Sequence, residues 1–207
     1  MLGDWHSYSD CAGSAVHVGA RNIIELPSSF VSSSQKGTDP LDVAAMVVPD
    51  DFVAQELRSP LPLDRTTAEA SSHEAQMRCI YGFPASKNKT AKRADSSRRV
   101  FTAYGFAYAG ASRHIQSDYP QYKKTTEHHV ALHYQKDGRN EKGEHVTPPH
   151  PRGISGGGLW STSDAFNQSP AILEGIAIEF HKDQSLVFST RIEHVLSFIR
   201  ERLPPGG

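Results

Sequence analysis

Residues 153–158 read Gly-Ile-Ser-Gly-Gly-Gly, after a proline-rich stretch at 148–151 and before an apolar pair. Glycine has no Cβ, so the backbone can bring two N–H groups to one point. Such a pair of donors is what an oxyanion hole requires. A serine hydroxyl beside that hole is a candidate acyl-transfer nucleophile. The first hypothesis is therefore a serine hydrolase in which Ser155 is the nucleophile and the N–H groups of Gly153 and Ser155 form the oxyanion hole.

The apolar residues around this run fall into short segments separated by clusters of Gly, Pro, Asp and Ser. Segments of this length and spacing are typical of an all-β barrel or sandwich. We expect strands at residues 16–18, 23–26, 43–48, 77–83, 101–109, 130–134, 173–180 and 186–189, with a hairpin loop at 181–184.

Two segments depart from the strand pattern. Residues 51–57 predict a short helix, and residues 191–203 predict a longer one. In the longer segment, helical spacing relates the apolar residues Ile192, Val195, Leu196 and Ile199. Thr190 is a candidate N-cap, and the Pro-Pro-Gly-Gly stretch at 204–207 ends the helix. We expect this helix to dock on the β domain.

Composition limits the class of protein. The chain has 207 residues, enough for one large domain or two small ones, and its net charge is −1. This charge gives no overall field that favours nucleic acid or an anionic membrane. The two cysteines, Cys11 and Cys79, fit a reducing compartment. With no visible signal peptide and no apolar run of membrane-spanning length, we expect a cytoplasmic location.

Eleven histidines raise the question of a metal site. His129 and His133 would share one face of a strand, with His128 on the other face. This spacing is not a recognised zinc signature, and the two cysteines are far apart in sequence. We therefore expect solvent-facing histidines, no metal and no cofactor.

Asp42 stands directly before the apolar run at 43–48 and is better placed than Asp39. A carboxylate at the mouth of a strand can be partly buried and can accept a hydrogen bond from an imidazole. That bond fixes the histidine tautomer and stabilises the imidazolium. The alternative is an aspartate that only caps a turn.

An acid that opens a D-x-A strand, a later G-x-S-G-G, two more strands and a C-terminal helix together resemble the chymotrypsin-like (trypsin-like) serine peptidases of bacterial type. The resemblance implies a double β-barrel, with a partial N-terminal barrel in residues 1–70 that carries the acid. Residues 71–207 would form the second barrel, which carries the nucleophile, and the C-terminal helix. It also implies an endopeptidase in which Ser155 attacks the peptide bond and Asp42 is the acid.

Weaker similarities extend the resemblance. Residues 173–177 resemble the strand that lines the primary specificity pocket, and residues 80–84 resemble a Gly-x-Pro stretch that opens the second barrel. Residues 146–152 would form one wall of that pocket and hold no acid suited to a Lys or Arg side chain. Arg152 and His150 favour an acidic or polar substrate residue, and the proline-rich wall equally favours a small apolar one.

The family's general-base histidine ends a strand in a small-residue context such as Ala-Ala-His, and this chain has no such segment. The first half of the first barrel is also missing from the pattern. Three placements of the base stay open: His6, a histidine before Met1 in a longer chain, or no base at all. The sequence therefore predicts a serine endopeptidase-like domain, or an inactive relative of one.

Two other readings stay open. A peptidase fold without its histidine would still bind an extended peptide along a strand edge as a non-catalytic module. An α/β-hydrolase also uses G-x-S-x-G, followed in sequence by an acid and a histidine, here Asp183 and His194. The glycines at 156–158 are poor helix formers and argue against that elbow. The expected partner is a protein or peptide substrate, with no nucleic acid and no membrane.

Overall fold

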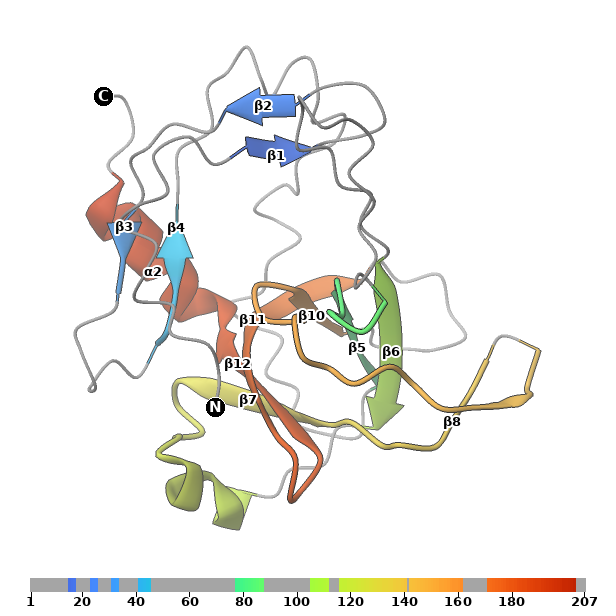
Figure 1. Cartoon of the computed structure of the whole chain (residues 1–207). Coiled ribbons are helices and arrows are strands. Elements are labelled where there is room, and N and C mark those ends of the chain that lie inside the picture. The colour runs from blue at the N-terminus through green and yellow to red at the C-terminus, as the bar shows by residue number, and fades with distance from the viewer. Residues whose placement is uncertain are drawn as a thin grey trace.

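The computed structural model of the chain describes residues 15–17, 23–25, 31–33, 41–45, 77–87, 105–111, 116–140, 142–161 and 171–203. Within these residues the architecture is mostly β, which confirms the predicted class. A curled antiparallel sheet of six strands is its centre, and the C-terminal helix α2 lies beside the sheet (Figure 1).

The six strands run in the order β6-β5-β10-β11-β12-β7, and every neighbouring pair is antiparallel. Their bounds are β5 Met77–Gly82, β6 Phe106–Ala111, β7 His129–His133, β10 Gly158–Ser161, β11 Ile172–His181 and β12 Leu186–Arg191. Strands β10, β11 and β12 are successive neighbours, and β7 lies beside β12. This is a Greek-key arrangement, in which a long connection separates β7 from β10. That connection carries the projecting hairpin of β8 (Gly138–Arg139) and β9 (His145–Val146) (Figure 1).

The two outer strands of the sheet approach each other, so the sheet forms a half-barrel. The Tyr108 hydroxyl on β6 donates to the carbonyl of His133 on β7 at 3.5 Å and accepts from the N–H of Gln135 at 2.9 Å. The interior is filled by one apolar cluster whose members include Ile80, Leu132, Tyr134, Ile154, Leu159 and Val187. The core of the half-barrel is therefore built from strands that the alternating apolar pattern predicted.

Strand β12 is buried on both faces, which explains why its sequence is a continuous apolar run rather than an alternating one. Val187 faces the half-barrel core, whereas Leu186 and Phe188 pack in a second cluster with Tyr119. Tyr119 belongs to the 3₁₀ segment η3 (Gln116–Tyr122), which covers that face. Its hydroxyl accepts from the N–H of Ala131 at 2.9 Å and fastens the segment to β7.

Helix α2 (Ile192–Arg202) confirms the predicted C-terminal helix. Ile192, Val195 and Phe198 form a third cluster with Leu173 of β11 and with Val43. The predicted N-cap is wrong. Strand β12 runs directly into the helix, Arg191 occupies the N-cap position without a side-chain cap, and the Thr190 hydroxyl instead donates to the carbonyl of Leu41.

The N-terminal part of the chain contributes two short pairs. Strand β1 (Ala15–His17) pairs with β2 (Ile23–Glu25), and β3 (Val31–Ser32) pairs with β4 (Ala44–Ala45). The predicted helix at 51–57 lies outside the described residues. The described residues thus contain one six-stranded half-barrel sheet within residues 71–207 and only these two short pairs within residues 1–70. No helix in the described part of the chain is long and apolar enough to cross a membrane.

Candidate functional site

The loop that carries Ser155 consists of two tight turns joined end to end. The N–H of Ile154 donates to the carbonyl of Pro151 at 2.9 Å, and the N–H of Gly157 donates to the carbonyl of Ile154 at 2.8 Å. Gly153 and Gly156 have φ values of +91° and +85°, in the left-handed region that favours glycine. The glycines that suggested a site in the sequence are therefore required by the loop conformation.

Backbone hydrogen bonds on two sides hold this loop in place. Gly156 N–H donates to the carbonyl of Ala177 at 2.8 Å, and Ala177 N–H donates to the carbonyl of Gly157 at 2.8 Å, which ties the loop to β11. On the other side, Ala85 N–H donates to the carbonyl of Arg152 at 2.7 Å. The Ile154 side chain, 2% exposed, is anchored in the half-barrel core. The loop is therefore a fixed element, although it lies at the surface.

Two backbone amides of this loop donate no hydrogen bond to the described residues. Within the residues that the structure describes, the N–H groups of Gly153 and Ser155 donate no hydrogen bond. Gly153 is exposed and Ser155 is half-buried, so both amides are open to an approaching ligand. Donors without an internal partner are what an oxyanion hole must keep free for the developing negative charge. The structure places the predicted pair where such a role is chemically possible.

The Ser155 hydroxyl already has a partner. It donates to the carbonyl oxygen of Ile178 on β11 at 2.9 Å. In a catalytic triad the hydroxyl instead donates to the imidazole that will remove its proton. A backbone carbonyl takes no proton, so the hydroxyl as observed is oriented but not activated. Sequence reasoning gave no signal for this bond, because any residue at position 178 supplies the same carbonyl.

Asp42 lies between two anchored neighbours. The carbonyl of Leu41 accepts from the Thr190 hydroxyl, and the Val43 side chain is buried against β11 and α2. Val43 also exchanges hydrogen bonds with Ser33, whose hydroxyl accepts from the Val43 N–H at 2.9 Å. Asp42 itself is exposed and has a φ of +49°, a conformation that aspartate tolerates better than most residues. The partial burial that the sequence allowed for this residue is therefore not seen in the described structure.

The acid and the serine are anchored to adjacent positions of the sheet. Thr190, which bonds the Leu41 carbonyl, pairs in register with Ile176 of β11. The serine loop bonds Ala177 and Ile178, the next two residues of β11. Both predicted site segments are therefore tied to neighbouring strands of one sheet. By strand alternation, however, Thr190 shares the face of Leu186 and Phe188, whereas Val187, which lines the cavity beside Ser155, lies on the opposite face.

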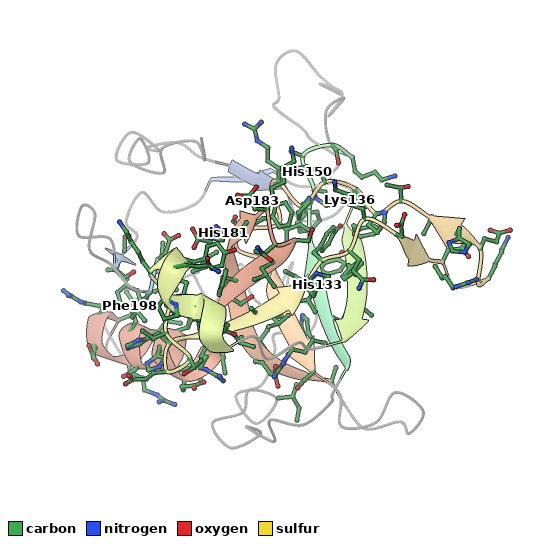
Figure 2. All side chains as sticks on the ribbon, turned by 90° about the horizontal axis from the view of Figure 1, so that it is seen from below. His133, Lys136, His150, His181, Asp183 and Phe198 are labelled. Carbon is green, nitrogen blue, oxygen red and sulfur yellow. The ribbon has the colours of Figure 1, made fainter. Side chains whose placement is uncertain are left out.

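The described histidines do not complete a triad. His133 ends β7, His181 ends β11, and His150 lies in the segment between β9 and β10; Figure 2 labels all three at separate places. No hydrogen bond joins a described histidine to Ser155. His6 lies outside the described residues.

One expectation about the histidines is wrong. His129 is not solvent-facing but fully buried, because β7 lies against β12 and under η3. Its Nδ1 atom lies 3.2 Å from the backbone N–H of Thr125 and 3.2 Å from that residue's carbonyl. The described residues contain no group of three or more histidine, cysteine or acidic side chains arranged to hold a metal.

A charged cluster on β11 was missed by sequence reasoning. Glu179 Oε1 lies 2.8 Å from Lys124 Nζ and 2.9 Å from His181 Nε2, and the His181 ring packs at 4.2 Å from that of Tyr122. Burial alone would raise the pKa of Glu179. Hydrogen bonds and charges from His181 and Lys124 outweigh burial and lower it below its usual value. The available signal was the spacing of Glu179 and His181, which places them on one face of a strand.

Two features frame Ser155. A small cavity of about 30 Å³ lies beside it, with walls from residues 151–155 and from Ala177, Glu179, Phe180 and Val187. Close to the other side of the loop, Tyr81 and Phe83 expose 46% and 49% of their surface and pack edge to face at 5.8 Å. The contact with the loop is direct, since a Cβ on Gly153 would lie 3.0 Å from the Phe83 carbonyl.

A much wider recess of about 1100 Å³ lies between β6 and the β8–β9 hairpin. Its described walls include Cys79, Tyr108 and His133, and none of the serine loop. Size therefore does not identify the site in this protein.

Comparisons with known proteins place the chain in no family. No family model matches the sequence, no curated protein is similar to it, and no solved structure resembles its fold closely enough to count as a match.

Proposed function

We propose that this chain carries the acyl-transfer site of a chymotrypsin-like serine peptidase, with Ser155 as nucleophile. The observation that carries the proposal is the serine loop with its two unpartnered amides. Attack of Ser155 Oγ on a peptide carbonyl would move negative charge onto the carbonyl oxygen. The N–H groups of Gly153 and Ser155 would stabilise that charge without reorganisation, because the turns already fix them.

The position of the acid gives independent support. In a triad the aspartate orients the histidine and stabilises its charged form. The segment around Asp42 is docked on β12 and α2, and its anchor Thr190 pairs with Ile176 of β11, one residue before Ala177, which bonds the serine loop. The Greek-key sheet followed by a C-terminal helix agrees with the second barrel and helix that the resemblance implies.

The general base is the part of the proposal that depends on residues beyond those described. His6 is the candidate within this sequence, and a histidine upstream of Met1 is the other. Such a base would take the Ser155 proton and return it to the leaving amine. Loss of a triad member lowers turnover by several orders of magnitude but leaves the contribution of the oxyanion hole.

A non-catalytic peptide-binding module is the second candidate. It is favoured by one observation, the hydrogen bond from the Ser155 hydroxyl to the Ile178 carbonyl. In that role the loop amides would hold a substrate-like carbonyl, and no acyl-enzyme would form. The α/β-hydrolase alternative has no support, because Ser155 is followed by the turn into β10 rather than by a helix.

Labelling with a fluorophosphonate at neutral pH tests the proposal, because the reagent reacts with an activated serine. We expect labelling of the wild-type chain and none in Ser155→Ala. Ser86→Ala is the matched control, since Ser86 is an exposed serine on a turn near the loop. His6→Ala then tests the base.

The outcomes separate the two candidates. Labelling that persists in Ser155→Ala refutes the assignment of the nucleophile. Absence of labelling, combined with a Gly153-dependent affinity for peptides, would replace the enzyme by the binding module.

A further inference from the structure

We infer that the cavity beside Ser155 selects substrates whose residue on the carbonyl side of the cleaved bond is glycine or alanine. This inference rests on the proposed function and specifies its substrate class. An acyl group bonded to Ser155 Oγ would place its side chain in the nearest recess. That recess is the cavity bounded by the serine loop and by Ala177, Phe180 and Val187.

The size of the cavity is the first argument. Its volume is about 30 Å³. One water molecule needs about 10–15 Å³ of such space, so the cavity holds about two waters, which leaves room for a methyl group but not for the four carbons of a leucine side chain. The walls are also fixed, since Ile154 and Ala177 are each 2% exposed and belong to the half-barrel core. A larger side chain would have to displace close-packed residues.

The charge of the walls is the second argument. Among the described lining residues Glu179 is the only acid, and its carboxylate is bound to Lys124 at 2.8 Å and lies 2.9 Å from His181. Its carboxylate is therefore already paired with Lys124 and in contact with His181, and does not attract a Lys or Arg side chain into the cavity.

The rim gives the third argument. The His150 ring packs edge-on against Phe180 at 5.5 Å, and its Nδ1 accepts from the N–H of Arg152 at 3.1 Å. The Arg152 guanidinium would attract an acidic side chain by charge, but glutamate and aspartate exceed the volume of the cavity behind it. The volume of the cavity, rather than the charge at its rim, therefore determines which substrate side chain is preferred.

Acylation by the p-nitrophenyl esters of N-acetylalanine and N-acetylleucine measures this selection. Ser155 Oγ bonds to the carbonyl carbon, the ester C–O bond breaks, p-nitrophenolate leaves, and the hydroxyl proton passes to the buffer. The readouts are nitrophenolate release and the mass of the acylated chain, each after subtraction of the rate in Ser155→Ala. One extra methylene in a tight site costs about 10- to 200-fold. We therefore expect the alanine ester to react at least about ten times faster than the leucine ester.

Val187→Ala is the diagnostic variant, because it removes two methyl groups from the cavity wall. It should raise the rate with the leucine ester, relative to the alanine ester, by at least about ten-fold. Val130→Ala is the matched control. Val130 belongs to the same core and is 1% exposed against 2% for Val187, but it does not line the cavity. In Val130→Ala the ratio of the leucine-ester rate to the alanine-ester rate should equal that of the wild type.

Equal Ser155-dependent rates with the two esters would overturn the inference and leave Ser155 as the nucleophile. The inference would also be overturned if the ratio of the leucine-ester rate to the alanine-ester rate changed as much in Val130→Ala as in Val187→Ala. Absence of Ser155-dependent acylation by either ester, together with absence of fluorophosphonate labelling, would instead remove the proposed function, and this inference with it.

Discussion

Replacement of Gly153 by alanine tests the serine loop most directly, because the structure predicts two separate costs. The first is the φ of +91°, since a non-glycine residue in a sparsely populated region costs about 1–3 kcal/mol. The second is contact, since the new Cβ would lie 2.8 Å from the backbone nitrogen of Ala85 and 3.0 Å from the Phe83 carbonyl. Overpacking of this kind costs a further 1–3 kcal/mol, roughly. We expect a total loss of about 2–6 kcal/mol in the free energy of unfolding.

Gly143→Ala separates the two costs. Gly143 has a φ of +78°, and a Cβ there would meet nothing within 4 Å. This variant should lose only the conformational part, about 1–3 kcal/mol. Urea unfolding of both variants measures the difference. Equal losses would refute the argument from contact.

The same substitution should slow the reaction of Ser155. A Cβ at position 153 must push the loop away from Ala85 and so move the Gly153 amide. Loss of one oxyanion donor lowers the rate by about 10²- to 10³-fold. The fluorophosphonate labelling rate, measured at a urea concentration where the variant remains folded, provides the assay. An unchanged labelling rate in folded Gly153→Ala would refute the role of this amide.

Three further predictions concern the acid, its anchor and the charged cluster. Asp42→Asn should lower Ser155 turnover by about 10⁴-fold if the acid orients a histidine. Steady-state kinetics of the wild type and the variant measure this loss. Thr190→Val removes the bond to the Leu41 carbonyl and should cost about 1–3 kcal/mol in urea unfolding. Glu179 has a lowered pKa, so its contribution to stability is present above its ordinary pKa of 4.5 and is lost as the pH falls through the lower folded value. Urea unfolding from pH 7 down to pH 3 should show this loss in the wild type and less of it in Glu179→Gln.

The sequence predicted the elements whose pattern reflects their own burial. Residues 173–180 and 186–189 appear as β11 and β12, and residues 191–203 appear as α2. Their apolar content is set by packing on the sheet, so composition and period were sufficient. The tight turns of the serine loop were also predictable, because Gly153 and Gly156 adopt a backbone conformation that other residues rarely adopt.

The features that the sequence did not predict depend on contacts between segments that are distant in the chain. The Thr190 hydroxyl fits an N-cap by local rules, but the Leu41 carbonyl competes for it from a distant part of the chain. His129 resembles a surface histidine, and only the pairing of β7 with β12 buries it. The hydrogen bond from the Ser155 hydroxyl to Ile178 ends on a main-chain carbonyl, which a pattern of side chains cannot predict.

The bond between Thr190 and Leu41 spans 149 positions, against 23 for the bond between Ser155 and Ile178. Loop closure costs more entropy as the loop lengthens, and distant contacts form late. During synthesis the serine loop and the first strands of its sheet emerge before residue 190 exists to receive the acid segment. At about 5–20 residues per second, seconds pass between Ser155 and Thr190. A nascent chain therefore forms the serine loop before the segment that carries Asp42 can dock, and that docking waits until β12 has joined the sheet.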